Sequence, residues 1–286
     1  MYNTAIIAVL FAAILESIII IVGNTFTVFV FWKNRNGPKR TFLFVINLAV
    51  ADLFVGFTEP ISIGAFIIPG HLVDENFNSA QGKNILTAFQ IMFGFGSVLF
   101  LALISVERAY ALIWPLRHRA ASTRSYIYSA TLAWITAIFA GALTLLTVLE
   151  ILDFVYLKVA LGSAKGLCLV TICVSYLAIR TRLNCKVPAL DGARNRQNEA
   201  QQNAKLSRAL FIMITASLLF WVPSLVVHST QYLCECIPLL AYHMSTLFRL
   251  ANSLVNPIIY SFKIPMFKEI FKRVKLFKQS KKYGIN

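Results

Sequence analysis

Apolar residues dominate the chain in long runs that short polar segments separate. Each run has about 20 residues or more, the length that a helix needs to cross about 30 Å of hydrocarbon. Seven runs can be placed, at 4–32, 41–68, 84–113, 125–150, 153–180, 206–233 and 237–262. Hydrophobic residues make up 58% of the chain and charged residues only 14%, which excludes an ordinary soluble domain. The pattern predicts an all-α membrane protein, a bundle of seven transmembrane helices.

The basic residues predict how these helices are oriented. The chain has a net charge of +15, and 22 of its 27 Lys and Arg residues follow the first, third, fifth and seventh runs. Positively charged loops stay in the cytoplasm, so we expect the N-terminus outside and the C-terminus inside. Only Lys83, Lys158 and Lys165 are assigned to the opposite side. The charge would then face anionic membrane lipid, and a nucleic-acid partner is not expected.

The segment that follows the last run predicts a short helix lying on the membrane surface. Over residues 263–278 the apolar side chains Phe267, Ile270, Phe271 and Val274 fall on one helical face, with cations on the other. No second domain is visible. Residues 1–286 are therefore expected to form one membrane domain that includes this amphipathic helix.

Polar residues interrupt the last apolar run in a regular way. Asn252 and Asn256 lie one turn apart and share a helical face, with Ser253 beside them and Tyr260 one turn further on. Pro257 removes a backbone hydrogen bond and bends the helix. Polar groups at this depth are costly, so they indicate a working interior rather than a lipid-facing surface.

Three other motifs stand at defined places in the runs. Asp52 is a single acid within the second run, where an isolated carboxylic acid would stay protonated. Glu107 and Arg108 are adjacent at the inner end of the third run, and as a pair could simply extend toward the membrane surface. Trp221 precedes the helix-bending Pro223 in the sixth run, an arrangement that is more often ordinary core packing.

Together these motifs resemble those of rhodopsin-like G protein-coupled receptors, including the Asn-Pro-Ile-Ile-Tyr run at 256–260, Glu107-Arg108-Ala109 and Phe220-Trp221-Val222-Pro223. The resemblance implies a non-enzymatic plasma-membrane receptor that binds an extracellular ligand and activates a heterotrimeric G protein when its sixth helix swings outward. It implies an activation switch of Glu107, Arg108, Tyr176, Asn256, Pro257 and Tyr260. It also implies an internal sodium pocket of Asp52, Ser97, Asn252, Ser253 and Asn256, with Asn24 bracing Asp52.

Departures from the family pattern concern the cysteines. Lys83 occupies the place of the usual third-helix cysteine, and no cysteine lies between the fourth and fifth runs, so the usual extracellular disulfide cannot form. The pattern is similar to that of the melanocortin, adenosine, cannabinoid and lysophospholipid receptors, with melanocortin receptors nearest in their cysteines. Cys234 and Cys236 are the only cysteines expected outside, and the sequence leaves open whether they form a disulfide or remain free thiols.

The sequence defines the ligand less closely. Gln90 stands where amine receptors carry an aspartate, which disfavours monoamines, and Leu250 stands where opsins carry the retinal lysine, so no retinal is expected. The polar residues of the outer half suit a peptide, a nucleoside or an acidic lipid. The candidate ligand pocket consists of Glu59, Gln90, Trp221, Ser224, His228, Thr246 and Arg249. Burying Arg249 unpaired would be costly, so Glu59 is its expected partner, with Glu16 as second choice.

Two alternatives compete with a signalling receptor. A polytopic transporter could place Asp52, Glu59 and Arg249 along a permeation path, but it would predict internal repeats and broken helices in matching halves, and neither is found. A non-signalling relative of these receptors is the closer alternative. The intact Glu107-Arg108 pair and the Asn-Pro-x-x-Tyr run argue against it.

Overall fold

The described part of the chain is built from helices. The computed structural model describes residues 4–33, 39–67, 80–148, 154–184, 212, 215–231 and 236–263. Its helices are α1 (Thr4–Lys33), α2 (Lys39–Ile67), α3 (Ala80–Ile113), α4 (Pro115–Ala120), α5 (Thr123–Val148), α6 (Phe154–Asn184) and α8 (Leu239–Lys263). A further helical stretch covers 215–231, and none of these described residues forms a β-strand.

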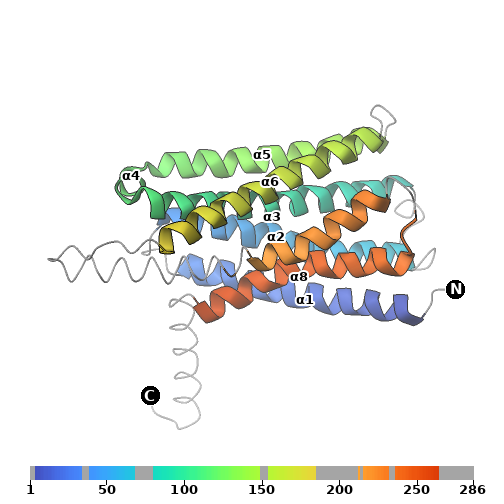
Figure 1. The fold of residues 1–286 in the computed structure, drawn as a ribbon. Helices are drawn as coiled ribbons and strands as arrows, with labels where there is room; N and C mark the ends of the chain where they lie inside the picture. Colours follow the sequence, from blue (N-terminus) through green and yellow to red (C-terminus); the bar gives the residue numbers. More distant parts are fainter. Residues whose placement is uncertain are drawn as a thin grey trace, which may run out of the picture.

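The long helices run alongside one another as a bundle, and the predicted all-α, seven-transmembrane fold is confirmed (Figure 1). The division between the fourth and fifth spans, which rested on spacing, falls between Val148 and Phe154. The short helix α4, which begins at Pro115, was not predicted. The amphipathic helix expected over 263–278 lies outside the described residues from 264 onward.

Five of the described helices, α1, α2, α3, α5 and α6, are long and apolar enough to cross a membrane by length and composition alone. Helix α8 is different because it carries a continuous polar face. Ser245, Asn252, Ser253 and Asn256 are all buried on this face, and Arg249 lies between them at helical spacing. The polar groups that lower the hydropathy of α8 therefore point into the protein and not toward lipid.

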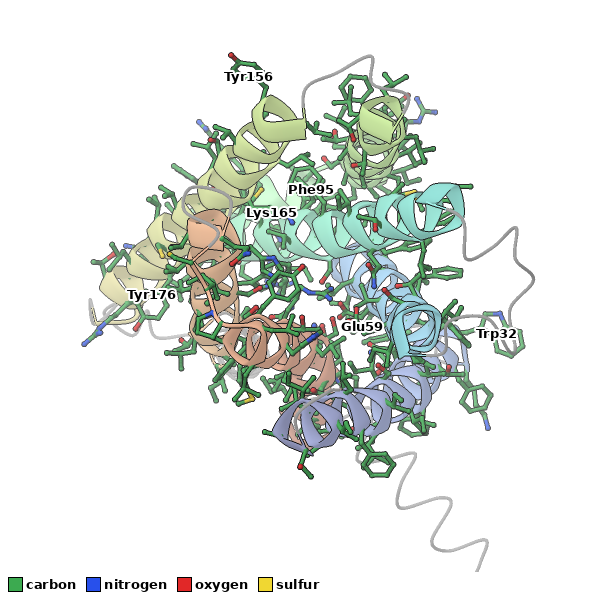
Figure 2. The ribbon with its side chains drawn as sticks, turned by 90° about the vertical axis from the view of Figure 1, so that its right-hand side faces the viewer. Trp32, Glu59, Phe95, Tyr156, Lys165 and Tyr176 are labelled. Atoms are coloured by element: carbon green, nitrogen blue, oxygen red, sulfur yellow. The ribbon has the colours of Figure 1, made fainter. Side chains whose placement is uncertain are left out.

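Helix α3 occupies the middle of the bundle, where it packs against α2, α5 and α6, while α1 packs against α2 and α8. The outer surface is apolar, as lipid requires. Phe11 and Val22 of α1 and Leu132 and Phe139 of α5 each expose more than half of their surface. In the view along the bundle, Trp32 and Tyr156 point outward while Glu59 and Lys165 lie toward the centre (Figure 2).

Small residues allow the helices to approach closely. A Cβ atom at Gly56 of α2 would lie 3.0 Å from Cγ2 of Ile20 and 3.2 Å from the carbonyl oxygen of Ser17, both in α1. Close backbone contact of this kind replaces the hydrophobic driving force that helices lack inside a lipid bilayer. The α1–α2 contact thereby fixes the position of α2, which carries both Asp52 and Glu59.

Candidate functional site

A cavity of about 490 Å³ opens at the end of the bundle that the charge pattern assigns to the outside. Its walls come from α1, α2, α3, α5, α6, the 215–231 stretch and α8. The structure brings all seven residues of the predicted ligand pocket to this outer cavity: Glu59, Gln90, Trp221, Ser224, His228, Thr246 and Arg249. Pockets for small ligands commonly have volumes of about 300–1,000 Å³, so the space is large enough for one small organic molecule.

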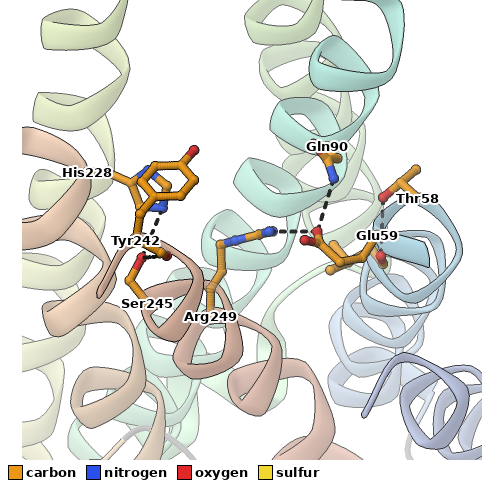
Figure 3. Close-up of polar contacts among 8 residues, drawn as sticks. Thr58, Glu59, Gln90, His228, Tyr242, Ser245 and Arg249 are labelled. Carbon is orange, nitrogen blue, oxygen red and sulfur yellow. Dashed lines mark hydrogen bonds and ion pairs between the residues drawn. The ribbon is translucent and has the colours of Figure 1, made fainter. Parts of the chain in front are cut away.

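An ion pair crosses the floor of this cavity. Nη2 of Arg249 donates to Oε2 of Glu59 at 2.7 Å, and Nε2 of Gln90 donates to the same oxygen at 3.0 Å (Figure 3). The predicted pairing of Arg249 with Glu59 is therefore present, and Glu16, the second choice, is not the partner. A single carboxylate thus links α2, α3 and α8 at one depth in the bundle.

A second polar group faces the cavity beyond Arg249. Oγ of Ser245 donates to the carbonyl oxygen of Tyr242 at 2.7 Å and lies 3.5 Å from Nε2 of His228. The rings of His228 and Tyr242 meet edge to face, with centroids 4.8 Å apart. Figure 3 shows this group on the side of Arg249 away from Glu59. The 215–231 stretch is therefore connected to α8, and two of the side chains that connect them, His228 and Tyr242, line the cavity.

Sequence reasoning missed one charged residue of the cavity. Lys165 was grouped with the basic residues of the outer side, but it lies within α6 and lines the cavity. Its Nζ is 5.7 Å from the centroid of the Trp221 ring. The position of Lys165 inside the apolar run 153–180 was the available signal, because a charge within such a run indicates an internal site.

Below the cavity, Asp52 sits at the centre of a buried hydrogen-bond network. Its Oδ1 accepts hydrogen bonds from the hydroxyls of Ser97 and Ser253, and its Oδ2 accepts one from Nδ2 of Asn256, each at 2.7 Å. All four residues are at most 3% exposed. Asn252 is also buried, but neither of its amide atoms has a hydrogen-bond partner in the described part of the chain.

Pro257 shapes this network from within α8. A proline has no N–H to donate, so the carbonyl of the residue four positions earlier, Ser253, loses its helical partner. Nδ2 of Asn24 donates to that oxygen at 3.3 Å and also to the carbonyl of Ile20 at 3.0 Å. Asn24 therefore braces Asp52 indirectly, through the backbone of Ser253, and not by a bond to the carboxylate itself.

The same proline packs closely against a glycine on the facing helix. A Cβ atom at Gly23 would lie 3.0 Å from Cβ and 3.1 Å from Cγ of Pro257. Gly23 and Asn24 together let α1 receive the proline ring and the carbonyl that it leaves free. Further along α8, Tyr260 is 1% exposed and its ring meets Phe31 edge-on, at a centroid distance of 6.5 Å.

At the opposite end of the bundle, where α3 ends, Glu107 joins two basic groups. Oε2 of Glu107 pairs with Nε of Arg108 at 2.5 Å, and neither side chain is more than 5% exposed. Oε1 of Glu107 lies 2.8 Å from Nε2 of His118, on the short helix α4. The His118 ring meets Tyr110 and Tyr126 edge-on at centroid distances of 6.0 and 6.4 Å. Sequence reasoning missed His118, because nothing in the chain predicted that α4 folds back onto Glu107.

The remaining predicted residues lie on α6 and just before α8. Tyr176 is half-buried on α6, and its hydroxyl accepts a hydrogen bond of 3.4 Å from Nη1 of Arg180. Cys236 is disulfide-bonded, which the sequence had left open, and Cys234, the partner considered there, lies outside the described residues. Cys168 of α6 is a free thiol, as is Cys173 further along the same helix.

Comparisons with known proteins agree with this arrangement. The model of the 7 transmembrane receptor (rhodopsin family) matches residues 23–260. Adenosine receptor A3 of Canis lupus familiaris is 25% identical over 285 residues, covering 90% of this chain and 87% of that receptor. Adenosine receptor A3 of Ovis aries is 26% identical, covering 90% and 86%. Somatostatin receptor type 4 of Rattus norvegicus is 24% identical, covering 89% and 69%.

These relatives are receptors and not enzymes, and adenosine receptors are among the four groups suggested by the cysteine pattern. The match covers every motif that carried the resemblance, from Gly23 and Asn24 to Tyr260. The chain belongs to the rhodopsin family of seven-transmembrane, G protein-coupled receptors.

Proposed function

We propose that this protein binds an extracellular ligand in the outer cavity and activates a heterotrimeric G protein at its opposite, cytoplasmic face. The observation that carries the proposal is the continuous polar face of α8. Arg249 of this face contacts the cavity, Ser253 and Asn256 bond to Asp52, and Tyr260 lies one turn further toward the cytoplasm. A ligand that displaces α8 would therefore move the cavity wall, the Asp52 network and Tyr260 together.

The proposed orientation places the N-terminus outside and the C-terminus in the cytoplasm. Lys33 at the end of α1, Arg117 on α4 and Arg182 near the end of α6 support it, because positively charged segments stay on the cytoplasmic side. This end of the bundle also carries Glu107 and Arg108. The outward movement of the 215–231 stretch, which the family resemblance implies, would open the cytoplasmic face beside Arg108.

The ligand is proposed to be a peptide, a nucleoside or an acidic lipid. The names of the relatives point to two different chemistries, adenosine, which is a nucleoside, and somatostatin, which is a peptide. The walls of the cavity offer hydrogen-bonding groups on α2, α3, the 215–231 stretch and α8, and they include the charged Lys165 and Arg249. Polar ligands of modest size fit this lining better than purely apolar ones.

The family membership bears differently on the two alternatives, a polytopic transporter and a non-signalling receptor relative. Membership of the receptor family leaves no place for a polytopic transporter. A non-signalling relative would share the fold and the cavity, so only the cytoplasmic end separates it from a signalling receptor. The buried Glu107–Arg108 ion pair is a costly arrangement to keep without a use, which favours signalling.

The Asp52 network is proposed to hold a sodium ion. Its residues fit a small hard cation, because they supply carboxylate, hydroxyl and amide oxygens. Buried oxygens without hydrogen-bond partners in the described residues lie on the same residues or beside them: Oδ1 of Asn24, Oδ1 of Asn252 and Oδ1 of Asn256. Asp52 would supply the negative charge, and Ser97, Asn252, Ser253 and Asn256 would surround it. A sodium ion would neutralise Asp52 and stabilise the packing of α8 against α2.

Arg108→Ala should abolish activation of the G protein while leaving surface expression close to that of the parent. The arginine is proposed to contact the G protein only after activation frees it from Glu107. The measurement is nucleotide exchange on purified G protein, with receptor numbers determined by surface labelling. Undiminished nucleotide exchange in Arg108→Ala would contradict the proposed coupling. The matched control is Arg117→Ala, because Arg117 is an exposed arginine of α4.

His118→Phe should raise basal G protein activation about three- to tenfold, because it removes a hydrogen bond that holds Glu107 in the inactive state. Such a bond is worth about 0.5–1.5 kcal/mol, and the variant keeps an aromatic ring between Tyr110 and Tyr126. His118→Gln, which keeps a hydrogen-bond donor, should behave more like the parent. The measurement is basal nucleotide exchange, and equal exchange in all three proteins would mean that His118 does not hold the switch.

Sodium should lower basal activation roughly fivefold or more when it replaces potassium at constant ionic strength, and Asp52→Asn should remove this effect. An ion shifts an equilibrium only through its different affinity for two states, and the pocket is proposed to collapse on activation. The measurement is nucleotide exchange in membranes at increasing sodium concentrations. Equal sodium sensitivity in the variant and the parent would leave Asp52 with a purely structural role.

Glu59→Gln and Arg249→Gln should each lower the free energy of unfolding by about 1–3 kcal/mol, because each leaves a largely buried charge without its partner. The charge swap Glu59→Arg with Arg249→Glu should recover much of this loss. The measurement is thermal unfolding of the purified receptor. Single variants as stable as the parent would contradict a structural role for the pair.

The same variants test whether Arg249 also contacts the ligand. In that case Arg249→Gln should weaken agonist potency by about ten- to a thousandfold, or roughly 1.4–4 kcal/mol, while surface expression survives. A charge-swapped receptor with recovered stability and normal potency would restrict the pair to a structural role.

A further inference from the structure

Lys165 is a cation that has no ion-pair partner in the described part of the chain. It lies toward the centre of the bundle, in the wall of the outer cavity (Figure 2). Among the described residues, no carboxylate pairs with it, and its ammonium group instead faces the Trp221 ring at 5.7 Å. A cation–π contact supplies only part of what an ammonium group loses on leaving water. Lys165 is therefore placed to gain from a negative charge that arrives with a ligand.

The charges of the cavity lining do not balance. Among its described residues the lining has one carboxylate, Glu59, against the ammonium of Lys165 and the guanidinium of Arg249. Glu59 already accepts hydrogen bonds from Arg249 and Gln90, so its charge is used by the ion pair. Lys165 and Arg249 line the same cavity, so their like charges repel each other. An anion bound on the Lys165 side would relieve this repulsion and complete the charge balance.

Trp221 offers a second donor beside Lys165. Its side chain is 5% exposed and lines the cavity, and its Nε1 has no hydrogen-bond partner in the described part of the chain. A buried donor without a partner costs free energy that a ligand acceptor would recover. Two groups on different helices, the α6 ammonium and the indole N–H of the 215–231 stretch, thus lie in the same part of the wall, and neither has a polar partner in the described part of the chain.

Apolar side chains make up part of the remaining wall. Leu157 and Leu161 precede Lys165 on the same helix, Leu225 follows Trp221, and Leu10 of α1 and Ile63 of α2 also line the cavity. We propose that the cavity binds an organic anion whose carboxylate or phosphate pairs with Lys165 and whose apolar body lies against these side chains. The inference deepens the proposed receptor function and rests on it for the use of the cavity as a ligand site.

Two matched pairs of probes test the charge requirement. N-dodecanoylglycine and its primary amide differ only in the carboxylate, and dodecyl phosphate and dodecanol differ in the phosphate. The purified receptor in lipid nanodiscs is heated with each probe, and its unfolding temperature is measured over a concentration series. We expect at least one anion to stabilise the parent at concentrations about ten- to a hundredfold lower than its neutral partner.

Variants then assign the effect to Lys165. Lys165→Gln should lose the preference for the anion, Lys165→Arg should retain it, and Trp221→Phe, which keeps a ring but removes the N–H, should weaken it. Lys33→Gln is the matched control, because Lys33 also lies over an aromatic ring, Phe29, but is exposed at the other end of the bundle. Without probe, Lys165→Gln should be at least as stable as the parent.

Three results would overturn the proposal. They are equal stabilisation of the parent by anionic and neutral probes, an unchanged anion preference in Lys165→Gln, and a similar loss of preference in Lys33→Gln. If Lys165→Gln does not fold, Lys165→Arg and Trp221→Phe still decide, since a lost preference in the former or an unchanged one in the latter contradicts the site. The measurement contains no G protein, so its failure is distinct from a failure of the Arg108→Ala test.

Discussion

The rest of the bundle depends on the buried carboxylate of Asp52. A polar group at this depth has neither water nor lipid to bond with, so its partners must come from the protein itself. Asp52 obtains them from α3, through Ser97, and from α8, through Ser253 and Asn256. Three helices are held in register by one side chain. Any movement of α8 against α2 has to break or exchange these bonds, which makes this network the natural place to couple the two ends of the receptor.

The proline of α8 changes how this helix bonds to its neighbours. In a regular helix the Ser253 carbonyl would accept from residue 257, but Pro257 has no N–H. The free carbonyl is taken by Asn24 of α1, and Gly23 makes room for the proline ring. The backbone irregularity of α8 is thus stabilised by a different helix. Kinks in helices occur at prolines of this kind, so Pro257 marks the place where α8 departs from a regular helix.

The charged residues at the two ends of the bundle differ in how their ion pairs are arranged. At the outer level Glu59 and Arg249 form a pair, and the nearby Lys165 lacks one among the described residues. At the proposed cytoplasmic end Glu107 serves two partners, Arg108 and His118. A charged side chain that has its ion-pair partner stabilises the packing of the helices without ligand. A charged side chain that lacks a partner is stabilised when a ligand of opposite charge binds. This distribution suits a receptor in which a charged ligand binds at the outer site and Arg108 is released from Glu107 at the inner site.

The sequence by itself determined the seven-transmembrane fold and most residues of the buried networks. Spans of about 20 apolar residues leave a helix as the only structure that satisfies its backbone in lipid, and polar residues inside such spans must face the interior. For this reason Asp52, Asn256 and the Glu59–Arg249 pair could be identified from the chain alone. The same reasoning applies to Lys165, although its position inside a span was not used to place it in the interior.

Only the tertiary structure decided which polar atoms meet. Helix spacing fixes the face of a residue but not its partner on another helix, so the bond from Asn24 to the Ser253 carbonyl could not be foreseen. The contact between His118 and Glu107 depends on how α4 folds back after Trp114, which no periodic pattern encodes. Such contacts are set by the relative rotation and depth of whole helices, and these result from the packing of all side chains together.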